Sequence, residues 1–193
     1  MGTSRLEAFS DGVIAILITI MVLDLRLPAG SDLASLRMAA PNLLLYLLSF
    51  VLLGIYWNNH HHMLQATERI GGTVLWANLH LLFWLSLVPY ATRWMGASHF
   101  AALPTAVYGV VLILAAIAYT ILQNRIIALQ GHDSRLAQAI GNDIKGYASL
   151  AGYALAIPAA FINPGISCAL YALVALIWLV PDRRIEHALN HSA

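Results

Sequence analysis

Six apolar segments, each near the length that crosses a lipid bilayer, limit what this chain can fold into. A membrane-spanning helix needs roughly 20 apolar residues. Hydropathy predicts helices over 8–27, 42–63, 73–92, 104–124, 145–162 and 165–181. Only 10% of the residues are charged, which is far below the level of a soluble domain. We therefore expect an all-α membrane protein with six transmembrane helices per chain, forming a single domain over residues 1–193.

The punctuation between the segments agrees with these helices. Pro41 and Pro104 precede apolar runs, and proline is tolerated in the first turn of a helix, where its missing N–H has no helical partner. The stretch INPGI (162–166) predicts a tight turn between the last two helices. The fifth segment has the weakest signal, because it is short and carries Pro158 near its end.

The basic residues predict the orientation in the membrane. With six crossings both termini share a side, and seven basic residues lie on it: Arg5, Arg69, Arg125, Arg135, Lys145, Arg183 and Arg184. The other side holds three: Arg26, Arg37 and Arg93. Basic residues favour the cytoplasmic side, so both termini are predicted to be cytoplasmic.

Several function classes find no support in the sequence. A net charge of +1 provides no basic surface for nucleic acid. Cys168 is the single cysteine, which excludes a disulfide within the chain and a multi-cysteine metal site. Ser149 and Ser167 lack the G-x-S-x-G context of a nucleophilic serine, and no glycine-rich phosphate loop occurs. We expect no enzyme activity and no cofactor.

The first apolar segment has two different faces. At 100° per residue, one stripe collects four bulky side chains: Phe9, Ile16, Ile20 and Leu23. Thr19, the single hydroxyl of the run, lies at the edge of this stripe, whereas Asp11 points to roughly the opposite side. Such a stripe is also typical of a helix that faces lipid, and Thr19 could simply bond to its own helix backbone.

Polar residues crowd the cytoplasmic entrance of this segment. A carboxylate at a membrane boundary is costly and is usually paired or solvated. Arg5 and Ser10 are candidate local partners of Asp11. A structural network and a direct role in transport are both consistent with this pattern.

The stretch NNHHH (58–62) invites a metal site, which we do not predict. Successive helical residues point 100° apart, so His60, His61 and His62 cannot all bind one ion. We expect hydrogen bonds from this cluster to Arg5, Ser10 or Asp11 instead. Asn78 and His80 in the third segment are expected to bond between helices.

Four stretches resemble the transmembrane protein 175 family of potassium channels. The pattern Arg-x-x-x-Phe-Ser-Asp-Gly (5–12) looks like the signature that opens the family's first helix. YWNNHHH (56–62) resembles its Trp/Asn/His cluster at the end of the second helix. NLHLLFWLSLVPYAT (78–92) is similar to its third helix, and LIWLVPDRRIE (176–186) to its closing segment.

This resemblance implies an assembly and a pore. Family members with a single six-helix repeat are prokaryotic homotetramers, in which the first helices line a central pore without a Thr-Val-Gly-Tyr-Gly filter. The hydrophobic constriction maps onto Ile16, Ile20 and Leu23, and the selectivity threonine maps onto Thr19. We expect a K⁺ channel in the plasma membrane, with lipid, K⁺ and further copies of the chain as partners.

The entrance residues are expected to form a structural network rather than to contact ions. Its predicted members are Arg5, Phe9, Ser10, Asp11, Asn58, His60 and His61. Two other functions compete with the channel. One is a proton-coupled or small-solute secondary transporter with Asp11 and Asp24 as titrating groups, and the other is a membrane scaffold without transport.

Overall fold

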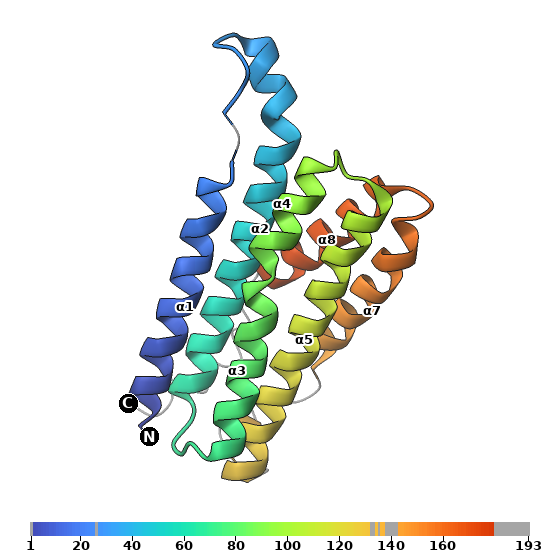
Figure 1. The fold of residues 1–193 in the computed structure, drawn as a ribbon. Coiled ribbons are helices and arrows are strands. Elements are labelled where there is room, and N and C mark those ends of the chain that lie inside the picture. Colours follow the sequence, from blue (N-terminus) through green and yellow to red (C-terminus); the bar gives the residue numbers. More distant parts are fainter. Residues whose placement is uncertain (1, 26, 132–133, 135, 138–142, 180–193) are drawn as a thin grey trace.

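Every predicted apolar segment forms helix in the computed structural model, which describes residues 2–25, 27–131, 134, 136–137 and 143–179. The helices are α1 (Thr3–Leu23), α2 (Leu33–Gln65), α3 (Gly72–Ser86), α4 (Val88–Ala97), α5 (Ala102–Gln130), α7 (Ile144–Ala159) and α8 (Pro164–Leu179) (Figure 1). The described ranges contain no β-strand. The all-α expectation is confirmed for this part of the chain.

The second helix departs most from its predicted bounds. α2 begins at Leu33, so Pro41, predicted at a helix start, lies inside it. Asp32 caps the early start, because its Oδ1 accepts a hydrogen bond from the Ser35 N–H at 2.8 Å. A proline removes one helical hydrogen bond, and the helix continues across this loss. The first turns of α2 project beyond the rest of the bundle (Figure 1).

The predicted third segment forms two helices that meet at Leu87. α3 ends at Ser86 and α4 begins at Val88, with Pro89 in the first turn of α4. Proline lacks an N–H and its ring crowds the carbonyl four residues earlier, so the helix breaks just before it. Together the two pieces extend over Gly72–Ala97.

Within the described residues, four helical stretches are long and apolar enough to cross a membrane. They are α1, α2, the α3–α4 pair and α5. α7 and α8 have 16 residues each, which is a rise of about 24 Å, short of a hydrocarbon core of about 30 Å. The chain is thus a multi-pass membrane protein, while crossing by α7 and α8 stays a prediction.

With the α3–α4 pair taken as one stretch, successive helices run in opposite directions (Figure 1). The start of α1, the α2–α3 connection and the end of α5 lie at one end of the bundle (Figure 1). The α1–α2, α4–α5 and α7–α8 connections lie toward the other end (Figure 1). Arg26, Arg135, Arg183 and Arg184, which contributed to the predicted orientation, lie outside the described residues.

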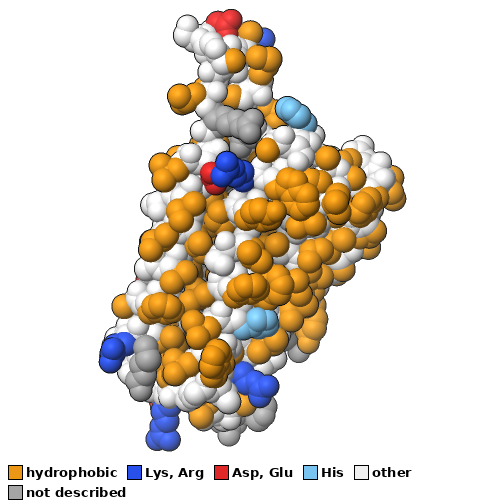
Figure 2. All heavy atoms as spheres, viewed as in Figure 1, with side chains coloured by type: hydrophobic (Ala, Val, Ile, Leu, Met, Phe, Trp, Pro, Cys, Tyr) orange, Lys and Arg blue, Asp and Glu red, His pale blue; other side chains and the backbone are white. Residues whose placement is uncertain are grey.

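α1 occupies one edge of the bundle and packs against α2, α3 and α4. Its packed side consists of five buried residues: Leu6, Ser10, Ile14, Leu17 and Met21. α7 and α8 pack together on the far side, where α8 also contacts α2 and α5. One face of the molecule is mostly hydrophobic, with Lys and Arg side chains at its lower end and in its upper third (Figure 2).

Candidate functional site

The outer side of α1 is exposed within the protomer. Side chains of the predicted constriction are 57% (Ile16), 43% (Ile20) and 82% (Leu23) exposed, and Phe9 is 49% exposed. Thr19 is exposed on the same side. The stripe expected from periodicity is therefore one continuous apolar face, directed away from α2, α3 and α4. A large apolar face of this kind is expected to border lipid, a further copy of the chain or a pore.

The Thr19 hydroxyl is oriented by its own helix. Its O–H donates to the Ile16 carbonyl oxygen at 2.9 Å. A hydroxyl offers one donor and two acceptor positions, so this bond uses the donor and leaves the oxygen lone pairs free to accept. On an exposed helix face those lone pairs are available to a cation or to water.

A buried polar chain joins α1, α3 and α2 near the entrance. The Asn78 Nδ2 donates to the Ser10 Oγ at 2.9 Å, and Asn78 Oδ1 lies 2.7 Å from His60 Nε2. Ser10 Oγ itself donates to the Leu6 carbonyl at 2.9 Å. Ser10, His60 and Asn78 are fully buried. Because buried polar groups are costly when unpaired, this chain fixes how the three helices meet.

Asp11 lies on the side of α1 that faces α2. Its Oδ1 accepts a hydrogen bond from the Trp57 indole N–H at 3.0 Å. The partners proposed from sequence were Arg5 and Ser10. Arg5 is exposed, Ser10 bonds to Leu6 and Asn78, and neither contacts Asp11 among the described residues. The indole of the next helix takes the place of the guanidinium, because Asp11 points across the α1–α2 interface rather than along its own helix.

His61 contacts the same side of α1. Its Nδ1 lies 2.7 Å from Glu7 Oε1, and its Nε2 lies 2.8 Å from Gln65 Nε2. Its ring stacks on the Trp57 ring with centroids 6.0 Å apart. Glu7 was missed from sequence, although its i, i+4 relation to Asp11 places both carboxylates on one helix face.

Three of the predicted network residues remain apart from these bonds. Among the described residues, the hydrogen bonds and the ion pair at this entrance link Ser10, Asp11, His60 and His61, but not Arg5, Phe9 or Asn58. Phe9 lies on the exposed stripe, and Asn58 is half-buried on α2. Asn78, expected to bond between helices, is the central member. The same expectation was wrong for His80, whose Nε2 accepts from the Trp84 indole N–H of its own helix.

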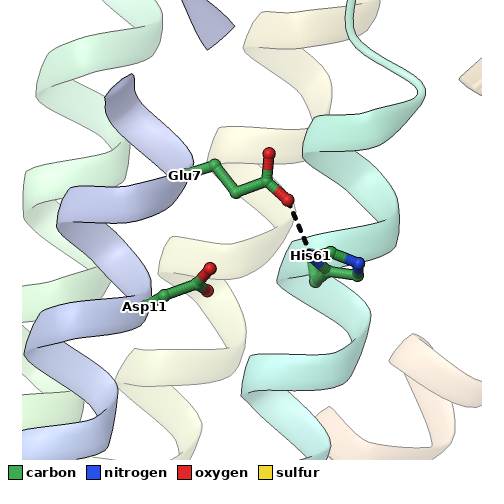
Figure 3. A group of neighbouring side chains, drawn as sticks. All are labelled: Glu7, Asp11 and His61. Carbon is green, nitrogen blue, oxygen red and sulfur yellow. Dashed lines mark ion pairs between the residues drawn. The ribbon is translucent and has the colours of Figure 1, made fainter. Parts of the chain in front are cut away.

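One three-residue set at the entrance has the donor types of a metal site. Glu7, Asp11 and His61 place one ligand atom each within 4.8 Å of one another. Figure 3 shows both carboxylates extending from α1 toward the imidazole on α2. Three consecutive histidines on a helix cannot surround one ion, whereas this set uses a single histidine with two carboxylates from another helix.

Asp24 lies at the opposite end of α1. Its Oδ1 pairs with Arg93 Nη1 of α4 at 3.0 Å. The pair borders a groove of about 280 Å³ that also includes Leu23, Asn42 and Thr92. Asp24 follows Asp11 by thirteen positions, a rise of about 20 Å along the helix. Asp11 and Asp24, the titrating groups expected in a transporter, therefore lie at opposite ends of α1 and do not form one site.

Known proteins resemble this chain in sequence. A family model described as "Endosomal/lysosomal potassium channel TMEM175" matches residues 5–89. A potassium channel of Chryseobacterium sp. (strain P1-3) is 56% identical over 192 residues, covering 100% of both chains. The human "Endosomal/lysosomal proton channel TMEM175" is 36% identical over 87 residues, which cover 37% of this chain and 17% of the human protein.

A solved structure has the same fold. It is the crystal structure of a "lysosomal potassium-selective channel TMEM175 homolog" from Chamaesiphon minutus, with a TM-score of 0.82 and 26% sequence identity. The match covers 93% of this chain and 97% of that chain.

Proposed function

This chain belongs to the TMEM175 channel family, and on that premise we propose that it forms a potassium-permeable channel whose pore is lined by α1. Four copies surround the pore in the plasma membrane of a prokaryote, with both termini in the cytoplasm. The observation that carries the proposal is the exposed apolar face of α1, which bears the Thr19 hydroxyl and is covered by no helix among the described residues.

The pore constriction consists of rings of Ile16, Ile20 and Leu23. Successive rings lie four and then three residues apart, which is a rise of about 6 Å and then about 4.5 Å. A narrow apolar throat holds water poorly and strips hydration from an ion at high cost, so it closes by dewetting. Exposure of all three side chains in the protomer supports their assignment to the pore.

Selectivity arises at Thr19. The bond from its hydroxyl to the Ile16 carbonyl keeps the proton toward the helix, so the oxygen presents lone pairs outward. Four such oxygens would return part of the hydration shell that K⁺ loses. A single hydroxyl ring offers fewer ligands than stacked carbonyl rings, so we expect a modest preference for K⁺ over Na⁺.

The polar entrance is structural in this proposal. The Ser10–Asn78–His60 chain is buried and the Asp11–Trp57 bond crosses between helices, so these groups hold α1 against α2 and α3. They lie on the sides of α1 that face the other helices, away from the apolar stripe.

Proton conduction is the second candidate, because the matched human protein is named a proton channel. A proton-coupled transporter using Asp11 and Asp24 has weaker support. Asp11 bonds to Trp57 and Asp24 pairs with Arg93, at opposite ends of α1. Asp11 also points away from the stripe of Ile16, Ile20 and Leu23.

Ion flux in proteoliposomes tests the proposal. Currents or tracer fluxes recorded under K⁺, Na⁺ and proton gradients should give a reversal potential that follows the K⁺ gradient. Flux driven by the proton gradient and coupled to another solute would instead establish the transporter. A folded, reconstituted protein that carries no ion flux would instead support a membrane scaffold without transport.

A substitution in the throat tests the pore assignment separately. Ile16→Asn should raise conductance several-fold, because amide groups replace apolar ones at a narrow ring and the throat wets. Ile117→Asn is the matched control, since Ile117 is exposed on α5 and α5 does not line the proposed pore. An unchanged or lower current in assembled Ile16→Asn protein would contradict the assignment of α1.

A further inference from the structure

We propose that Glu7, Asp11 and His61 form a binding site for a divalent first-row transition-metal ion, with zinc as the representative, that links α1 to α2. This inference does not depend on the proposed pore, because it concerns the opposite side of α1 and is tested by binding rather than by flux.

The donor set is the first argument. One imidazole nitrogen and two carboxylate oxygens are ligands that Zn²⁺ and its neighbours accept. The three ligand atoms already lie within 4.8 Å of one another. Donors around a tetrahedral zinc ion lie about 3.4 Å apart, given metal–ligand distances of about 2.1 Å. Side-chain torsions of Glu7 and Asp11 can supply the small difference, and a fourth position stays open to water.

Charge is the second argument. Glu7 and Asp11 are an i, i+4 pair on one helix face, and two like charges at this spacing repel. The contacts of these carboxylates among the described residues are the His61 imidazole and the Trp57 indole N–H. The indole is uncharged and an imidazole can supply one positive charge at most, so together they do not balance two negative charges at a membrane boundary, whereas a divalent cation does.

The residues behind the ligands are the third argument. Histidine ligands usually donate their second ring N–H to a neighbouring acceptor, which fixes the tautomer and the ring plane. The Gln65 amide lies 2.8 Å from His61 Nε2 and can present its oxygen to that nitrogen once Nδ1 binds a metal. The Trp57 indole N–H already donates to Asp11 Oδ1, so the second oxygen of the Asp11 carboxylate is available to bind the ion.

The geometry also explains why His61, rather than His60, is the histidine ligand. His60 is buried and bonded to Asn78, so its Nε2 is committed to the structural chain. His61 turns toward α1, where both carboxylates lie (Figure 3). The unit is therefore one residue from α2 and two from α1, and an ion there would fasten the two helices together.

Equilibrium dialysis of the full-length, EDTA-stripped protein in detergent against zinc measures the binding. Wild type should take up about one zinc ion per chain and unfold at a higher temperature with zinc than without it. Glu7→Gln and His61→Gln should weaken binding by about 100-fold and abolish the thermal shift. The matched controls are His62→Gln and Glu68→Gln, which alter a neighbouring histidine and an exposed carboxylate at the same end. Both should behave as wild type.

X-ray absorption at the zinc edge provides a readout on wild type alone, which holds even if a variant fails to fold. The spectrum should show nitrogen or oxygen ligands at about 2.0–2.2 Å with scattering from one imidazole. The proposal is overturned if wild type binds no more zinc than Glu7→Gln does, or if bound zinc shows no imidazole ligand. Loss of binding in His62→Gln with normal binding in His61→Gln would also overturn it.

Discussion

At the scale of single residues, α1 uses its polar side chains in two opposite directions. Thr19 faces outward with its proton donated to its own helix, whereas Asp11 faces α2 and accepts from an indole. The two groups differ in what they can offer an ion. The threonine oxygen has free lone pairs on the exposed stripe, while the aspartate is engaged between helices.

Thr19→Val should reduce the K⁺ over Na⁺ preference without loss of assembly. Valine keeps the volume and branching of threonine but removes the oxygen that would replace part of the hydration shell. Bi-ionic reversal potentials measure the effect, and size-exclusion chromatography checks assembly. Thr120→Val is the control, because Thr120 also bonds to its own helix but lies on α5. Identical reversal potentials for wild type and Thr19→Val would refute a role of this ring in ion choice.

Asp11→Ala should lower the thermal stability of the protein and leave the ion preference of surviving channels unchanged. The lost hydrogen bond from Trp57 is worth about 1 kcal/mol at a partly exposed site. Trp57→Phe removes the same bond while keeping an aromatic ring. In EDTA, the free energy of unfolding of the double variant Asp11→Ala/Trp57→Phe should therefore fall by less than the sum of the two single losses.

The same experiment separates the two possible partners of Asp11. Combining Asp11→Ala with Arg5→Ala should give additive losses, because the structure shows no bond between these residues. A non-additive effect with Arg5 and an additive one with Trp57 would reverse the assignment. A stable Asp11→Ala protein with altered ion preference would make Asp11 a permeation residue.

At the scale of helices, close approach decides where glycine is required. Gly109 on α5 packs against the Tyr171 hydroxyl of α8, and an added Cβ would collide with it and press on Ile157. Tyr171 is fully buried and donates to the Thr105 carbonyl at 2.9 Å. A side chain at position 109 would therefore push α8 away from α5 and disturb the buried hydrogen bond from Tyr171 to Thr105.

Gly109→Ala should destabilise the protein by about 1–3 kcal/mol, the usual cost of overpacking. Gly54→Ala is the control, since a Cβ there meets nothing within 4 Å. It should be neutral or slightly stabilising, because alanine favours helix over glycine. Melting temperatures in detergent compare the two. The cost of Gly109→Ala should shrink in a Tyr171→Phe background, and an undiminished cost would show that the collision is elsewhere.

At the scale of the whole molecule, the alternating helix directions set which connections share a side. The α4–α5 and α7–α8 connections lie toward the same end of the bundle, opposite the α2–α3 connection (Figure 1). The positive-inside bias predicts that the end with the α4–α5 and α7–α8 connections is extracellular. α7 and α8 are short, so their crossing is the part of the topology that most needs a direct measurement.

Single cysteines in a Cys168→Ala background should report this topology. A membrane-impermeant maleimide should label Ala101→Cys and Ile162→Cys from outside intact cells, and Glu68→Cys only after permeabilisation. All three positions are exposed in connections. External labelling at residue 101 without labelling at residue 162 would show that α7 does not cross. External labelling at residue 68 would show that the chain is inverted.

Local chemistry made much of this protein predictable from its sequence. Each apolar segment becomes a helix because backbone hydrogen bonds in a helix close within the segment, whatever lies around it. The outward stripe of α1 follows from the 100° rotation per residue, so Ile16, Ile20 and Leu23 share a face in the structure as expected. The break before Pro89 escaped prediction, although the steric cause lies in the sequence.

Partnerships between helices were decided by the tertiary structure alone. Asp11 meets Trp57 rather than Arg5, His60 reaches Ser10 through Asn78, and Glu7 joins Asp11 and His61. Periodicity tells which side of a helix a residue occupies, but not how far the helix rotates or slides against its neighbours. Those two quantities depend on the packing of all side chains at the interface, and they determine which polar groups come within bonding distance.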